Sequence, residues 1–110
     1  MNKKIEINYN GVDYTLEYNR GAIQYMEKSG LNISELETKP MTMIDILWRG
    51  AFWKNHRREK PEIIEEIYDG IKNKSDLNGA LSEMFVETYS ALIGDSDEED
   101  NSKNIEWKMS

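Results

Sequence analysis

Side chains that could carry out chemistry are few in this chain. The 110 residues include no cysteine and a single histidine, so they offer no thiolate and no two-histidine metal site. His56 lies beside Lys54, Arg57 and Arg58, which would repel a metal ion, and we expect it to be exposed at a polar helix end. The seven glycines form no phosphate-binding loop. The sequence therefore predicts a protein that is not an enzyme and has no cofactor and no metal.

A basic stretch at residues 49–60 is the first feature that could bind something. It contains one acid, Glu59, and five cations: Arg49, Lys54, Arg57, Arg58 and Lys60. Its local charge is +4, whereas the whole chain has a net charge of −7. Three interpretations are open: cations that suit the negative end of a helix, a dock for an acidic segment such as the chain's own tail, or a nucleic-acid contact. The overall acidity argues against general binding to nucleic acids or anionic membranes.

The apolar segment at residues 41–53 is the strongest candidate for a protein-binding surface, because nine of its thirteen residues are apolar. Helical spacing gives it one expected core stripe: Ile44, Leu47, Trp48, Ala51 and Phe52. Met43, Ile46 and Trp53 lie away from the centre of that stripe, so either the helix is surrounded or one side remains for a partner; Tyr25 and Tyr89 could extend such a surface. The candidate binding residues are Met43, Ile46, Trp53, Arg57, Arg58 and Trp107.

A hairpin and several helices must position these residues. Asn10-Gly11 is typical of a two-residue type I′ turn, and the alternation around it predicts strands at 4–9 and 12–17 that pair Tyr9 with Val12, Ile7 with Tyr14 and Ile5 with Leu16. Helical periodicity predicts four to five helices at residues 20–29, 34–38, 42–55, 61–72 and 76–93, with Thr42 as the cap of the third. The expected fold is α+β and mainly helical, with the hairpin packed on the helices because two strands alone are marginally stable.

The composition of the chain changes at Gly94. Residues 1–94 predict a single globular domain, since the apolar periodicity ends there. Five of the six residues 95–100 are acidic, which predicts a flexible acidic tail over 95–110 that ends in a Trp-containing segment. No apolar run reaches the roughly 18 residues of a membrane span, no secretory signal is evident at the start, and the absence of cysteine suits a reducing cytoplasm.

The order of these features along the chain is similar to that in a known protein family. The residues concerned are Tyr14-Thr15-Leu16-Glu17-Tyr18-Asn19-Arg20 at the end of the hairpin, Ile23-Gln24-Tyr25-Met26-Glu27 in the next helix, Leu47-Trp48-Arg49-Gly50-Ala51-Phe52-Trp53 in the aromatic helix, and Glu106-Trp107 after a long last helix and an acidic run. In this order, size and texture the chain resembles the tail assembly chaperones of long-tailed bacteriophages and of prophages in low-GC Gram-positive bacteria.

The resemblance implies a non-catalytic protein of the bacterial host cytoplasm that is absent from the finished virion. Such chaperones coat the long, apolar, helical tape measure protein, keep it soluble and recruit tail tube subunits. The implied partners are the tape measure protein, the tail tube protein and further copies of the chain itself. Two alternatives remain open: a small phage-encoded regulator or inhibitor that acts through an acidic surface, and a helical DNA-binding domain that uses the cations of residues 49–60.

Overall fold

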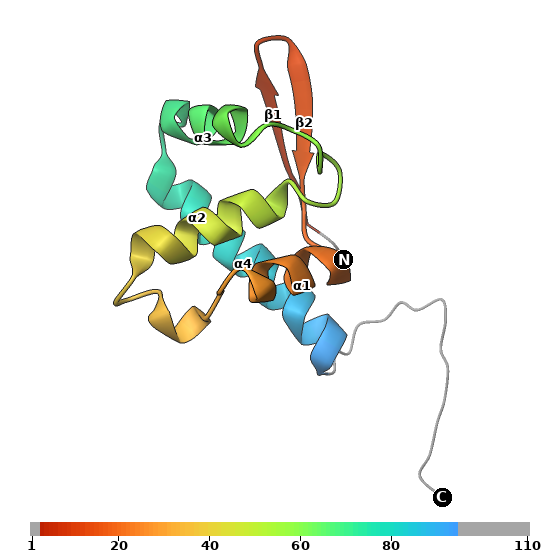
Figure 1. Cartoon of the computed structure of the whole chain (residues 1–110), viewed down its shortest axis with the longest axis vertical. Coiled ribbons are helices and arrows are strands. Elements are labelled where there is room, and N and C mark those ends of the chain that lie inside the picture. Colours follow the sequence, from red (N-terminus) through yellow and green to blue (C-terminus); the bar gives the residue numbers. More distant parts are fainter. Residues whose placement is uncertain (1–2, 95–110) are drawn as a thin grey trace, which may run out of the picture.

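The computed structural model of the chain describes residues 3–94, which begin with a two-stranded hairpin (Figure 1). Strand β1, Ile5–Tyr9, pairs with β2, Val12–Leu16, in the antiparallel register that the sequence predicts. Asn10 and Gly11 have φ angles of 53° and 81°, the left-handed backbone that a type I′ turn requires. The predicted hairpin is therefore confirmed in both its turn and its register.

Within residues 3–94, four α-helices and one 3₁₀-helix follow the hairpin, which confirms an α+β fold that is mainly helical. Their bounds are α1 Arg20–Lys28, η1 Ile33–Glu35, α2 Pro40–Ala51, α3 Pro61–Gly70 and α4 Lys74–Ile93. The side chain of Asn19 caps α1, because its Oδ1 accepts a hydrogen bond of 2.8 Å from the Ala22 backbone N–H. Each predicted helix thus has a counterpart in the structure.

The helices differ from their predicted bounds by up to four residues: α1 ends one residue and α3 two residues early, α4 begins two residues early, and α2 ends four residues early. Helix α2 begins at Pro40 rather than at Thr42 and ends at Ala51, because proline in the first turn has a suitable φ and needs no hydrogen-bond partner for its nitrogen. The segment predicted as helix 34–38 forms a single 3₁₀ turn. Asn32 starts this turn early, since its Oδ1 accepts from the Ser34 N–H at 3.1 Å, and Pro40 begins the next helix soon after.

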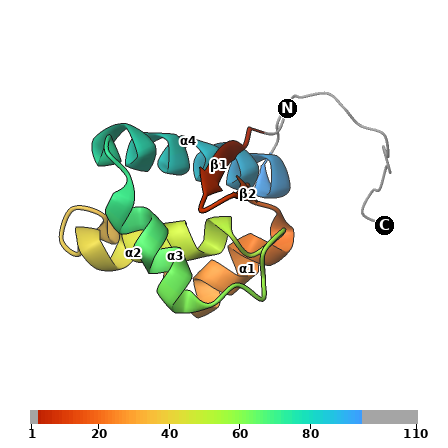
Figure 2. The ribbon, with the colours of Figure 1, turned by 90° about the horizontal axis from the view of Figure 1, so that it is seen from above.

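Helix α2 occupies the centre of the fold. It lies between α3 and α1 and crosses α4 in Figure 1. Figure 2 shows α4 on one side of the molecule and the three other α-helices on the opposite side. Among the described residues, the largest fully buried side chains are Trp48, Phe52, Leu16, Met26, Leu47 and Leu81. These side chains come from the hairpin, α1, α4 and α2 with its C-terminal end, and Ile64 and Ile67 of α3 complete one continuous core.

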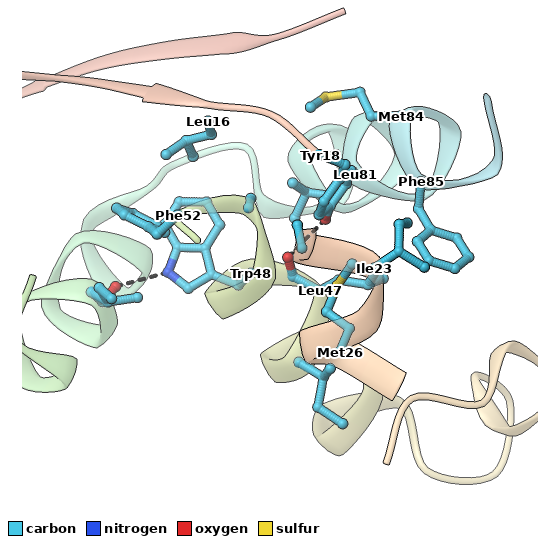
Figure 3. Close-up of a cluster of buried hydrophobic side chains, with 14 of the residues drawn as sticks. Leu16, Tyr18, Ile23, Met26, Leu47, Trp48, Phe52, Leu81, Met84 and Phe85 are labelled. Carbon is cyan, nitrogen blue, oxygen red and sulfur yellow. Dashed lines mark hydrogen bonds between the residues drawn. The ribbon is translucent and has the colours of Figure 1, made fainter. Parts of the chain in front are cut away.

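Polar atoms inside the core are paired (Figure 3). The Trp48 Nε1–H donates to the carbonyl of Ile64 in α3 at 2.8 Å, and the Tyr18 hydroxyl donates to the carbonyl of Leu47 at 2.7 Å. Burial raises the pKa of the Tyr18 hydroxyl far above its usual value, so it remains a protonated donor. These two bonds fix α2 against α3 and against the end of the hairpin.

Candidate functional site

Two of the predicted binding residues, Met43 and Ile46, belong to the core. Their exposed fractions are 2% and 7%, so the prediction that they face a partner is wrong. The physical reason is that α1, α4 and η1 all pack against α2, and the Asn32 backbone N–H lies 3.3 Å from the Met43 sulfur. For Met43 and Ile46, the structure shows the surrounded one of the two interpretations.

Trp53, a third predicted binding residue, is half-buried and packs within the domain. Its ring covers Gly21 in the first turn of α1, where a Cβ atom would come within 2.3 Å of the ring. The guanidinium carbon of Arg57 lies 3.9 Å from the centroid of the same ring, a cation–π arrangement, and the Arg57 Nε–H donates to the Trp53 carbonyl at 3.2 Å. Trp53 and Arg57 thus stabilise the loop after α2, while Arg57 remains exposed.

This loop also holds the hairpin, and we call residues 52–59 the hairpin clamp. The Thr15 backbone N–H donates to His56 Nε2 at 3.0 Å, and the Asn55 side-chain amide donates to the Thr15 carbonyl at 3.1 Å. His56 is therefore a half-buried acceptor and not the exposed residue that the sequence predicts. Its partner lies 41 positions away in the chain, a distance that local sequence patterns do not bridge.

The cations of residues 49–60 are largely engaged inside the domain. Three of the five have partners there: Arg49 with Asp45 and Glu65, Lys54 with Glu17, and Arg57 with Trp53. Arg58 is exposed, and among residues 3–94 neither it nor Lys60 has a carboxylate within 4 Å. The charge left for a nucleic-acid backbone is thus smaller than the sequence count suggests.

The Glu17 carboxylate makes the stability of the contacts between the hairpin and the hairpin clamp depend on pH. Its pKa is lowered, because the Asn55 amide donates to the charged form at 3.0 Å and the Lys54 ammonium lies 3.3 Å away. A lowered pKa in the folded state stabilises the fold above the unfolded value of 4.5, and this contribution is lost as the pH falls through the folded pKa.

We expect Glu17→Gln to lower the free energy of unfolding by up to about 1 kcal/mol at neutral pH, and to flatten its fall in acid below pH 4.5. Urea unfolding in a series of buffers measures both effects. Glu6→Gln, on the exposed face of β1, is the matched control and should have little effect on the free energy of unfolding at neutral pH. An unchanged acid response in Glu17→Gln would contradict this role.

Four of the exposed large apolar side chains gather at the end of α4. We call it the α4 strip; its residues and exposed fractions are Val86 52%, Tyr89 38%, Leu92 42% and Ile93 65%. Spacings of three and four residues place these side chains next to one another on one side of the helix. Exposed apolar groups that gather in this way are typical of interaction sites.

The α4 strip borders a groove between α4 and α1. The groove has a volume of about 190 Å³, and Tyr89, Leu92 and Ile93 form one wall while Ile23 and the polar residues Arg20, Gln24 and Glu27 form the other. The apolar wall can contact another apolar helix, and the groove beside it can take one of that helix's side chains. Trp107, the remaining predicted binding residue, and the predicted tail at 95–110 lie outside the described residues.

Comparison with known proteins adds the family of the chain. Among residues 3–94, no helix is long and apolar enough to cross a membrane, and no group of three or more histidine, aspartate or glutamate side chains could hold a metal ion. No curated protein and no solved structure matches the chain. Residues 1–110 match the family described as "Domain of unknown function (DUF5055)". The chain therefore belongs to the DUF5055 family.

Proposed function

We propose that this protein is a non-catalytic tail assembly chaperone of a bacteriophage or prophage. In this proposal it acts in the cytoplasm of the bacterial host, covers apolar helical surface of the tape measure protein, recruits tail tube subunits and is absent from the finished virion. The observation that carries the proposal is the α4 strip, an exposed apolar helix face with 38–65% of each side chain accessible. The order of the hairpin, aromatic helix and long last helix supports it independently.

The shape of the α4 strip suits a helical client. Two helices pack with side chains of one between those of the other at an axis separation of about 8–10 Å, and an apolar face on each is the usual requirement. Full burial of one large apolar side chain contributes about 1.5–3 kcal/mol, and these four are already partly covered. One strip therefore binds weakly, and stable coating of a long client requires several copies that act together.

The net charge supports the same proposal. A client coated with copies of a chain of charge −7 carries a large negative charge, and like-charged complexes repel one another. Such repulsion keeps apolar material from aggregating before assembly. The buried positions of Met43 and Ile46 remove these two residues from the client surface, so the proposal depends on α4.

Co-expression with a tape measure fragment tests this proposal. We expect the wild-type chain to keep the fragment in the soluble fraction, and the double variant Val86→Glu/Ile93→Glu to leave at least about tenfold less of it there, because two charges interrupt the apolar contact. Both residues are exposed, so the variant should fold, and circular dichroism with thermal unfolding checks this.

The matched control is Ala91→Glu, which adds a charge to an exposed position on the opposite side of α4. It should leave the fragment soluble. Soluble fragment with the double variant, or equal loss with Ala91→Glu, would show that the α4 strip does not bind the client.

A further inference from the structure

A second hollow, formed by α2 and α3, differs in chemistry from the α4 strip. Its volume is about 240 Å³, and its apolar lining comes from Met41, Ile44, Trp48 and Tyr68. This volume is below the roughly 300–1,000 Å³ of typical sites for small molecules. The hollow therefore has the size for one or two side chains of a protein partner and is small for a cofactor.

The apolar lining is available to a ligand. The Met41 side chain is 83% exposed at the start of α2, and a thioether chain adapts to apolar surfaces of different shape. Ile44 and Tyr68 are half-buried. The Tyr68 hydroxyl is already paired with the Asn78 side chain at 3.1 Å, and the Lys74 ammonium lies 5.5 Å from the centroid of its ring. Tyr68 therefore offers the remaining part of its ring rather than a free polar group.

Three carboxylates surround this lining, those of Asp45, Glu65 and Asp69. The Arg49 guanidinium pairs with Asp45 and Glu65 and balances one of these two charges. Asp69, one turn after Glu65 in α3, has no ion pair among residues 3–94. The Lys74 ammonium, 3.3 Å from the Asp69 carbonyl oxygen, balances a second charge. The hollow therefore has an apolar floor and a rim with a net charge of about −1, which favours a cationic ligand.

We propose that the α2–α3 hollow binds a helical segment of another protein that presents a large apolar side chain flanked by lysine or arginine. The apolar side chain packs against Met41 and Tyr68, and a flanking cation pairs with Asp69. The chain's own residues 95–100 include five acids, which the rim repels, so they do not fit this site. The inference concerns other residues than the α4 strip and does not rest on the tape measure proposal.

A synthetic amphipathic helical peptide of leucine and lysine is a suitable probe. We expect isothermal titration calorimetry to show saturable binding to the full chain, and no binding of the same peptide with glutamate in place of lysine. Among the methionine methyl signals in an NMR spectrum, that of Met41 should shift, whereas that of Met26, which is fully buried, should not.

Asp69→Lys should weaken the Kd for the leucine–lysine peptide by about tenfold or more, and Met41→Ser should weaken it several-fold. Glu6→Lys makes the same charge change on the exposed face of the hairpin and serves as the control. Equal weakening by Asp69→Lys and Glu6→Lys would show diffuse attraction to an acidic protein and overturn the proposal. Binding that survives Met41→Ser but is lost in Ile93→Glu would place the peptide on the α4 strip and also overturn it.

Discussion

Replacement of Trp48 by alanine should lower the free energy of unfolding by about 3–5 kcal/mol, the usual cost of truncating a buried aromatic side chain. Trp48 is 1% exposed, and its ring makes edge contacts with Phe52 and Tyr68 at centroid distances of 5.1 Å and 5.3 Å. The substitution also removes the bond from the indole N–H to the Ile64 carbonyl. Because small domains have a total stability of about 5–15 kcal/mol, this loss would leave little margin. Urea unfolding followed by circular dichroism measures it.

The variant Trp48→Phe separates the contribution of the aromatic ring to stability from that of the indole N–H and the larger ring volume. This variant retains an aromatic ring but removes the N–H donor and part of the ring volume, so we expect less than half of the alanine effect. A loss below about 1 kcal/mol for Trp48→Ala would contradict the position of Trp48 between α2 and α3, because a residue at the surface has little effect.

Gly50→Ala should lower the free energy of unfolding by about 1–3 kcal/mol, the usual range for an overpacked core. A Cβ atom on Gly50 would lie 2.3 Å from the Met26 sulfur and 2.4 Å from its Cγ. Met26 is fully buried, so its side chain has no free space into which it could move. The expected loss exceeds the gain of about 0.5–1 kcal/mol that alanine gives over glycine inside a helix.

Gly79→Ala is the matched control for Gly50→Ala. Gly79 lies in α4, is exposed, and a Cβ atom there would meet no other atom within 4 Å. Here only the helix preference acts, and the free energy of unfolding should rise by about 0.5–1 kcal/mol. If both substitutions stabilised the protein equally in thermal unfolding, the close approach of α1 to α2 at Gly50 would be refuted.

The parts of the fold that local chemistry determines could be predicted from the sequence. The Asn10-Gly11 turn fixes its own backbone geometry, and the alternation beside it then fixes the register of the strands. Asn19, Pro40 and Pro61 act on helix starts within one turn, so helix positions follow from nearby residues. The predicted start of α2 was wrong by two residues because proline, rather than Thr42, begins it.

The burial of Met43 and Ile46 could not be predicted, because it depends on how many elements surround α2. Periodicity gives the directions of side chains around one helix but not the neighbours that cover them. A surplus of apolar residues therefore indicated a binding face where the structure has a second layer of core. The attachment of His56 to Thr15 is similarly a tertiary contact with no local pattern.

The exposure of the α4 strip also could not be predicted from the sequence, because it too depends on which neighbours cover a helix. Leu81 and Leu92 are both apolar residues of α4, yet Leu81 is fully buried and Leu92 is 42% exposed. Leu81 belongs to the part of α4 that packs in the core, whereas Leu92 lies near the end of the helix, where it borders the open groove between α4 and α1. The exposed surface follows from the relative positions of helices, which single-sequence patterns do not give.

The most direct test of the client-binding account is to map the contact on the wild-type protein. Methyl NMR spectra of the labelled chain, recorded as a tape measure fragment is added, should show the largest shifts at Val86, Leu92 and Ile93 and little change at Val12, the exposed apolar residue at the hairpin tip. Shifts centred on the hairpin or on the region of Arg58, with the α4 strip unchanged, would contradict the account.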